Sequence, residues 1–254
     1  MIIKNKNVFY HRGSIGDIIY AIPTILACGG NAVLYLRDKE HLKFLYGLLM
    51  KQSYVIDVRY VGDVEKYGHS WTDGSIINLS GFAHIAWAKR DQHLVLSHLE
   101  TQNKEYDLSK AWIDKVEPKY LSDIIINRTK HYHDKEEIDW HLLEPFKDRC
   151  KFIGYTGEYK RFVKTYKIDI EFYQVQDALE VAQVIKGSKF FIGNQSVAFA
   201  IAEALKHPRS LEVCYAFNNC QPHGEDGYTY LTSDLINRYL DKGNNDEEGR
   251  DRAN

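Results

Sequence analysis

The segment that most constrains the fold is residues 185–205, IKGSKFFIGNQSVAFAIAEAL. Residues 189–193 form a short apolar run that ends in glycine, which is the pattern of a buried strand. Three polar residues follow, and then Val197–Leu205 is apolar nearly all round and rich in helix formers. A strand, a tight polar turn and a buried helix make half of a βαβ unit, so the pattern predicts an α/β protein with a parallel sheet.

The polar turn of this segment is a candidate ligand site. Asn194, Gln195 and Ser196 occupy it, at the carboxyl end of the strand, where open parallel sheets bind ligands. Ser196 is a candidate N-cap, and the free backbone N–H groups of a helix start favour an anion. The same pattern also fits a tight connection that holds no ligand.

A second strand–turn–helix pattern opens the chain. Residues 8–10 end a strand, residues 11–16 form a turn, and an apolar helix follows from Asp17 to residue 27. The turn lacks the third glycine of a dinucleotide fingerprint, and no Gly-Lys-Ser/Thr of a Walker A loop is present. An aspartate at a helix start is commonly a cap, so Asp17 is either a cap or a chemical group.

Two glycines shape this amino-terminal turn. Gly13 and Gly16 stand three residues apart, with Ser14 between them, and they let the backbone approach a ligand closely. The turn Gly13-Ser14-Ile15-Gly16 is therefore predicted to face a cleft.

The remaining chain alternates strands and helices. Strands are predicted at 32–36, 55–61, 75–79, 123–127, 151–155 and 211–215, and helices at 41–50, 83–99 and 178–184. The polar stretch 101–118 is interpreted as a connection. Two successive βα series predict two Rossmann-like domains facing a cleft, at 1–117 and 118–240, followed by a polar, frayed tail at 241–254.

Composition narrows the class of protein. Hydrophobic residues make up 44% of the 254 residues, enough for a sizeable core, and the four cysteines show no CxxC spacing. A net charge of −2 does not indicate a nucleic-acid or membrane partner, although a local patch stays open. No apolar run reaches the ~18 residues of a transmembrane helix. The amino terminus lacks a signal-peptide pattern, so a cytoplasmic location is predicted.

Four segments carry a family resemblance. Residues 13–25, GSIGDIIYAIPTI, resemble the amino-terminal motif of the heptosyltransferase-like glycosyltransferases, which have the GT-B fold. Residues 184–212 resemble the donor-site motif of that group, and residues 126–140 and 152–162 are similar to its phosphate- and base-binding loops. The resemblance implies two Rossmann-like domains, of which the second holds a nucleotide-sugar donor and the first holds an acceptor.

The resemblance also implies roles for single residues. Asp17 matches the acidic residue thought to be the general base, which would accept the proton of the acceptor hydroxyl. Arg128 matches a basic residue that neutralises the donor diphosphate, a role that suits a planar guanidinium.

Other matches concern the donor. The donor-site turn is matched by Asn194, Gln195 and Ser196. Glu203 or Glu212 would bind the donor ribose, or would instead be a solvated helix face and a strand-end carboxylate. Gly154 and Thr156 lie in the segment 154–158, which would line the base.

The sequence departs from the family pattern in the donor turn. It has Asn-Gln-Ser where many heptosyltransferases have an Asp-Ser-Gly pair, and Phe199 replaces the usual following histidine. The identity of the donor sugar therefore does not follow from the resemblance. No Asp-x-Asp motif is present, which predicts a reaction without metal or other cofactor, and the spacing of residues 131–134 fits a polar loop better than a metal site.

Three functions follow from these patterns. The leading hypothesis is a glycosyltransferase that moves a sugar from a nucleotide-diphosphate donor to a hydroxyl acceptor, which would be a lipid-linked glycan, a metabolite or a modified nucleic-acid base. The alternatives are a non-catalytic nucleotide-sugar-binding module and a nucleotide-sugar-modifying enzyme such as an epimerase. The latter lacks its fingerprint, and residues 155–160 are not expected to be helical.

Overall fold

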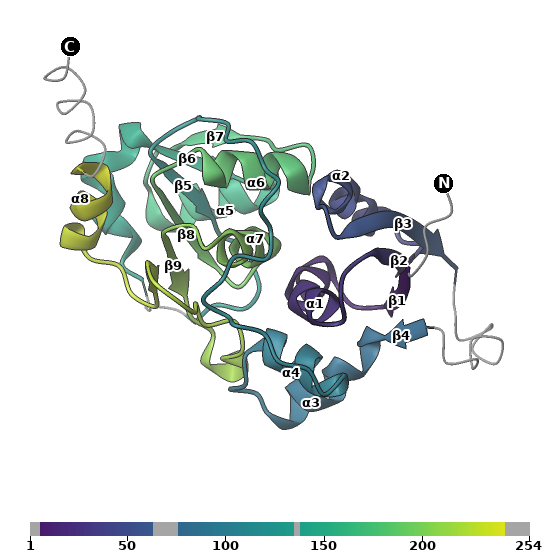
Figure 1. Cartoon of the computed structure of the whole chain (residues 1–254). Helices are drawn as coiled ribbons and strands as arrows, with labels where there is room; N and C mark the ends of the chain where they lie inside the picture. The colour runs from purple at the N-terminus through teal and green to yellow at the C-terminus, as the bar shows by residue number, and fades with distance from the viewer. Residues whose placement is uncertain (1–5, 63–75, 135–137, 242–254) are drawn as a thin grey trace, which may run out of the picture.

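A computed structural model describes residues 6–62, 76–134 and 138–241 of the chain, which form two units around two parallel sheets (Figure 1). The first sheet has the order β3-β2-β1-β4, with β1 (Asn7–His11), β2 (Ala32–Arg37), β3 (Val55–Val61) and β4 (Ile76–Asn78). Its helices are α1 (Ile15–Ala27), α2 (Tyr46–Lys51), α3 (Phe82–Ala88) and α4 (Leu94–Thr101), with 3₁₀ turns η1 (Glu40–Leu45) and η3 (Leu79–Gly81).

The second sheet has the order β10-β9-β8-β5-β6-β7. Its strands are β5 (Ile124–Asn127), β6 (Cys150–Ile153), β7 (Glu171–Tyr173), β8 (Phe190–Asn194), β9 (Arg209–Glu212) and β10 (Gly227–Tyr228). The helical elements are α5 (Thr156–Tyr166), α6 (Ala178–Lys186), α7 (Val197–Leu205) and α8 (Ser233–Asp241), with η4 (Trp140–Arg149) and η5 (Tyr215–Phe217). The central strands β5 and β8 are buried along their whole length, as expected for a parallel sheet covered on both faces.

The prediction of a strand, a polar turn and a buried helix at 185–205 is confirmed. The strand is β8, the helix is α7, and the Ser196 hydroxyl accepts a hydrogen bond of 3.2 Å from the backbone N–H of Phe199. Ser196 is thus the N-cap, and it satisfies one of the donors that a helix start leaves unpaired.

Two predictions of secondary structure are wrong. The single helix expected at 83–99 is two helices, because the chain turns between α3 and α4, where the backbone N–H of Leu94 binds the carbonyl of Asn219 from the second unit. Residues 156–160 are helical, contrary to expectation, since α5 starts at Thr156 and the Glu158 carboxylate accepts from the backbone N–H of Tyr155. Both differences depend on hydrogen bonds that apolar periodicity does not report.

Smaller differences concern element limits. The helix expected at 41–50 begins as the 3₁₀ turn η1 and becomes α-helical only in α2. The strand expected at 211–215 is β9, which lies at Arg209–Glu212 and pairs with β8 and β10. Residues 102–123 contain no helix or strand and join the units, while 242–254, most of the predicted tail, lie outside the described residues.

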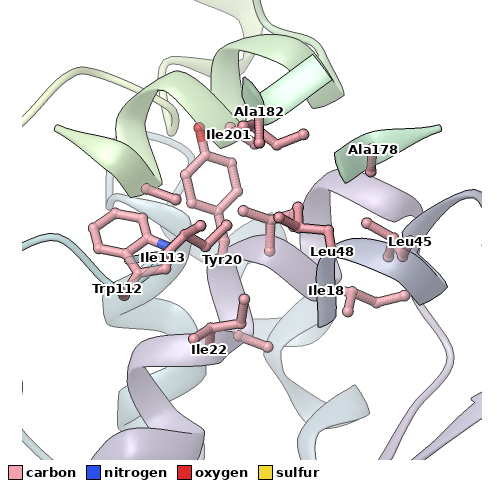
Figure 2. Packing of buried hydrophobic residues seen from close by; sticks show 14 of the residues in the cluster. Ile18, Tyr20, Ile22, Leu45, Leu48, Trp112, Ile113, Ala178, Ala182 and Ile201 are labelled. Atoms are coloured by element: carbon pink, nitrogen blue, oxygen red, sulfur yellow. The ribbon is translucent and has the colours of Figure 1, made fainter. Parts of the chain in front are cut away.

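One hydrophobic core runs through both units. Helix α1 lies against α7, and α2 lies against α6, between the two sheets (Figure 1). Figure 2 shows the side chains that meet there, all at most 2% exposed: Ile18, Tyr20, Ile22, Leu45, Leu48, Trp112, Ile113, Ala178, Ala182 and Ile201. Complete burial of one such large aliphatic side chain contributes about 1.5–3 kcal/mol. The two units are therefore held together by apolar packing of α1 and α2 against α7 and α6.

Within the described parts of the chain, no helix combines the length and apolar character needed to cross a bilayer.

Candidate active site

The turn between β1 and α1 holds Asp17 in a fixed position. Its Oδ2 accepts hydrogen bonds of 2.8 Å from both the backbone N–H and the hydroxyl of Ser14. Asp17 therefore does cap the helix start, as one of the two interpretations expected. Among the described residues, no donor binds its Oδ1. Burial raises the pKa of Asp17, and the two bonds from Ser14 act in the opposite direction.

Gly13 is required by the crowding of this turn. A Cβ at this position would lie 2.5 Å from the Cε1 of His11 and 2.8 Å from the Cβ of Asp17. The backbone N–H of Gly13 donates to the Nδ1 of His11 over 2.9 Å, so this nitrogen carries no proton. Burial lowers the pKa of His11 to about 3, which keeps the ring neutral. His11 was not predicted from the sequence as a site residue; it stands at the start of the predicted turn and ends β1 in the structure.

A pocket of about 340 Å³ opens beside Asp17. Its lining comes from the carboxyl ends of β1 and β2, the start of α1, the turn η3 and the start of α3: Tyr10, Arg12, Gly13, Asp17, Arg37, Ser80, Phe82 and Ala83. Arg12 follows β1 and Arg37 ends β2, and adjacent parallel strands bring such residues to one edge of the sheet. The pocket therefore combines one carboxylate with two guanidinium groups. Neither arginine was singled out from the sequence, although each stands at a predicted strand end.

In the second unit, Arg128 and Glu212 form a buried bidentate ion pair. The Nε of Arg128 donates to Oε2 of Glu212 over 2.7 Å, and its Nη2 donates to Oε1 over 2.9 Å. The side chains are 7% and 1% exposed. The guanidinium also lies 5.3 Å from the centre of the Tyr166 ring. Arg128 and Glu212, two of the residues predicted from the sequence to bind the donor, are thus brought together, and each compensates the charge of the other.

The donor turn is tied to the neighbouring strand ends. The Oδ1 of Asn194 accepts from the backbone N–H of Thr129 over 2.9 Å, and the Ser196 hydroxyl donates to Oδ1 of Asn127 over 2.8 Å. Gln195 points away from this group, because its Nε2 donates to the carbonyl of Phe217 over 2.6 Å. The carboxyl ends of β5 and β8 therefore form one hydrogen-bonded surface.

Gly154 and Thr156 lie on the β6 side of the same surface. Gly154 follows β6 with a φ of 135°, and a Cβ there would lie 2.7 Å from the Nδ2 of Asn127. Without a side chain at Gly154, the Nδ2 of Asn127 can reach the carbonyl of Ile153, to which it donates over 2.8 Å. Thr156 begins α5 directly beyond Gly154. Gly154 therefore lies next to Asn127, which in turn binds Ser196.

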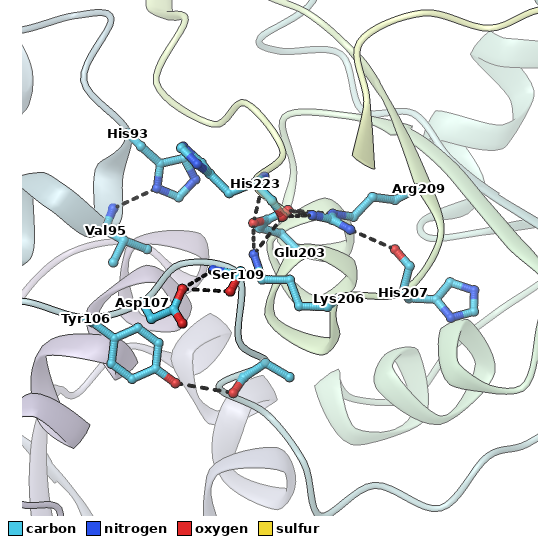
Figure 3. Close-up of polar contacts among 11 residues, drawn as sticks. His93, Val95, Tyr106, Asp107, Ser109, Glu203, Lys206, His207, Arg209 and His223 are labelled. Atoms are coloured by element: carbon cyan, nitrogen blue, oxygen red, sulfur yellow. Dashed lines mark hydrogen bonds and ion pairs between the residues drawn. The ribbon is translucent and has the colours of Figure 1, made fainter. Parts of the chain in front are cut away.

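Figure 3 shows Glu203 of α7 with Lys206 and Arg209, the two basic residues that bind its carboxylate. Glu203 is fully buried, its carboxylate is paired with Arg209 and Lys206, and it accepts from the backbone N–H of His223 over 3.2 Å. The interpretation of Glu203 as part of a solvated helix face is wrong, because Arg209 of β9 covers it. The carboxylates of Glu203 and Glu212 are thus both paired with protein donors, and Glu212 is the one that lies beside Arg128 and in register with Asn194.

The loop at 131–134 makes polar contacts within the protein. His133 lies 3.0 Å from Nη2 of Arg128, and Asp134 accepts from the backbone N–H of Tyr215 over 2.6 Å. In the segments that the structure describes, no group of three His, Cys, Asp or Glu residues has the arrangement of a metal site.

Known proteins resemble this chain in structure and not in sequence. No family profile and no curated protein sequence matches it. Among solved structures, the E. coli heptosyltransferase WaaC with ADP matches with a TM-score of 0.61 and 12% identity, over 94% of this chain and 99% of that one.

Further matches extend over similar lengths. A family 9 glycosyl transferase from Veillonella parvula has a TM-score of 0.59 and 10% identity, over 94% of this chain and 91% of that one. The E. coli ADP-heptose LPS heptosyltransferase II has a TM-score of 0.54 and 12% identity, over 96% and 100%. At such identities the match establishes the fold alone. The predicted α/β architecture with two Rossmann-like units is confirmed, and the chain has the GT-B fold of the heptosyltransferases.

Proposed function

We propose that the protein is a glycosyltransferase that moves a sugar from a nucleotide-diphosphate donor to a hydroxyl group of an acceptor, without a metal ion. The observation that carries this proposal is the position of Asp17. It lines a pocket at the carboxyl edge of the first sheet, and no donor among the described residues binds its Oδ1, in a fold shared with heptosyltransferases. The pocket is the acceptor site in this proposal.

Asp17 acts as the general base. Its Oδ1 takes the proton of the acceptor hydroxyl while the hydroxyl oxygen forms a bond to the anomeric carbon of the sugar, and the nucleoside diphosphate leaves with the electrons of the broken C–O bond. The two hydrogen bonds from Ser14 to Oδ2 hold the carboxylate in place. Its raised pKa strengthens it as a base, because a base is most effective when its pKa lies near the working pH.

The donor lies at the carboxyl edge of the second sheet. The start of α7 offers backbone N–H groups to the diphosphate, and Arg128 adds a guanidinium beside it. Asn194 and Ser196 order this turn through bonds to the β5 end. Glu212 lies next to Arg128 and is proposed to meet the ribose, with Gly154 and Thr156 on the side of the base.

The solved relatives support a nucleotide-sugar donor. One matching structure is described as containing ADP, and another as containing ADP-2-deoxy-2-fluoro heptose, with a TM-score of 0.59 and 12% identity to this chain. A further match, TibC, is described as iron-containing, and this chain covers 64% of its length. The donor sugar of the present protein stays unassigned, since its donor turn has its own sequence.

The test begins with nucleotide sugars screened by thermal shift, because a ligand that binds the native state raises the melting temperature. Asp17→Asn is then compared with the parent. Asparagine keeps an oxygen that accepts from Ser14, so the fold and the donor affinity should be unchanged, while the rate of transfer falls ~10²- to 10⁴-fold. Ser14→Ala is the control that removes one capping bond and keeps the base. Parent-like turnover of Asp17→Asn would leave Asp17 as a cap only.

A further inference from the structure

Exposed aromatic side chains gather where the two units meet. Trp87, in the last turn of α3, is 62% exposed, and its ring meets the ring of Phe217 edge-on at a centroid distance of 5.6 Å. Phe217 belongs to η5 of the second unit, which follows β9. The guanidinium of Arg90 lies 5.2 Å from the Trp87 ring centre and 5.6 Å from that of Phe217. We call these three residues the Trp87 cluster.

A further aromatic extends the cluster over the second unit. Tyr132 is 55% exposed, and its ring meets Phe217 at 5.8 Å. Single exposed aromatics are normal on protein surfaces. Several that touch one another and come from both units are a surface that is suited to binding a flat ring.

The Trp87 cluster lies near the proposed acceptor pocket, which shares helix α3 with it. Ala83 lines that pocket, and Trp87 lies four residues further along α3, so both face the same side, about 5–6 Å apart along the helix. On the other side, Phe217 is bound through its carbonyl to Gln195 of the donor turn. The cluster thus lies between the two proposed substrate sites.

The strand order separates the cluster from the proposed base site of the donor. Gly154 follows β6, whereas Phe217 follows β9, and β8 and β5 lie between these strands. The donor diphosphate is proposed at the ends of β5 and β8, with its base toward β6. A ring bound at the Trp87 cluster would therefore belong to the acceptor.

The chemistry of the cluster favours a nucleobase over a pyranose. The neighbours of Trp87 among the described residues are a guanidinium, which donates hydrogen bonds and also stacks on flat rings, and another aromatic ring. Neither supplies an oxygen that accepts a hydrogen bond from a sugar hydroxyl. Such a surface suits the π-face of a nucleobase, and the guanidinium groups of Arg12 and Arg37 in the adjoining pocket suit a phosphate.

We propose that the acceptor contains a nucleotide, with its base stacked at the Trp87 cluster and its phosphate at Arg12 and Arg37. This inference rests on the proposed function, because it names the acceptor class of that reaction. It also assigns Trp87 as a residue that determines acceptor specificity.

The test measures binding of a fluorescently labelled thymidine tetranucleotide by anisotropy, and the quenching of tryptophan fluorescence by its unlabelled form. Trp87→Ala should weaken binding roughly 5- to 150-fold, the usual range for loss of one base–aromatic stack. Trp87→Phe should retain most of the affinity and lose the quenching. Tyr120→Ala, which removes an aromatic that is 67% exposed and precedes β5, is the matched control and should bind like the parent.

A neutral tetrasaccharide and inorganic phosphate serve as competing probes. If the tetrasaccharide binds at Trp87 and the tetranucleotide does not, the ring is a pyranose and the proposal is wrong. Equal tetranucleotide affinity in Trp87→Ala and the parent also overturns it. Nucleoside diphosphate binding by thermal shift is read in the same variants. If nucleoside diphosphates do not bind but the tetranucleotide binds in a Trp87-dependent way, the result counts against the proposed glycosyl transfer and supports the stacking site.

Discussion

Replacing Arg128 by alanine leaves the carboxylate of Glu212, which is 1% exposed, without its bidentate partner. Breaking a buried pair from one side costs about 3–5 kcal/mol, because the remaining charge stays in a poorly solvated site. Typical domains are stable by about 5–15 kcal/mol, so the variant should fold with a much lower urea midpoint. The double variant Arg128→Met/Glu212→Gln removes both charges, and its free energy of unfolding should return close to that of the parent.

This pair of variants separates stability from function. If Arg128 faces the donor diphosphate, the double variant is stable and still binds nucleoside diphosphates weakly, and its transfer rate falls more than its affinity, since charge grows on the departing phosphate. Arg128→Lys keeps the positive charge but loses the planar set of guanidinium donors, so it should keep only part of the nucleotide affinity and only part of the transfer rate. Unfolding in urea, isothermal titration with ADP and UDP, and initial rates measure the three quantities. A stable double variant with parent-like affinity and rate would show that the pair is purely structural.

Three further predictions concern other parts of the site. Transfer should persist in EDTA, because Arg128 and the start of α7 supply the positive charge in the proposed mechanism; activity that disappears and returns with Mg²⁺ or Mn²⁺ contradicts this. Gly154→Ala should lower the melting temperature, because Gly154 has a φ of 135° and the added Cβ would collide with Asn127. Gly157→Ala in α5 is the control, since its added Cβ meets nothing within 4 Å and should stabilise the protein by up to about 1 kcal/mol. Equal shifts of the melting temperature in the two variants would refute the steric argument. His11 has a pKa of about 3 in the folded protein and about 6.5 in the unfolded chain, so between these pH values the unfolded chain binds more protons. The free energy of unfolding should therefore fall as the pH falls from 6.5 to about 3. The contribution of His11 to this slope is at most about 1.4 kcal/mol per pH unit. Urea titrations of the parent and of His11→Asn at several pH values measure this slope, and an unchanged slope in the variant excludes His11 as a source.

Much of the fold follows from neighbouring residues alone. The run of apolar residues in β8, the polar turn and the helix formers of α7 are local properties, and Ser196 caps the helix through a residue only three positions away. The same holds for Asp17 and Ser14. Elements and turns of this kind were therefore predictable, and because parallel strands share one carboxyl edge, so was the edge that carries the candidate site.

Only the tertiary structure decided which charges pair and which surfaces meet. Arg128 and Glu212 are 84 positions apart, and nothing local to either indicates a buried pair. In the sequence, Glu203 is compatible with a solvated helix face, but in the structure Arg209 of β9 pairs with it and both side chains are buried. The contact of Trp87 with Phe217 joins residues of the two units that are 130 positions apart in the chain. Local sequence determines backbone preference within a few residues, whereas burial and charge pairing depend on which distant segments the packed core brings together.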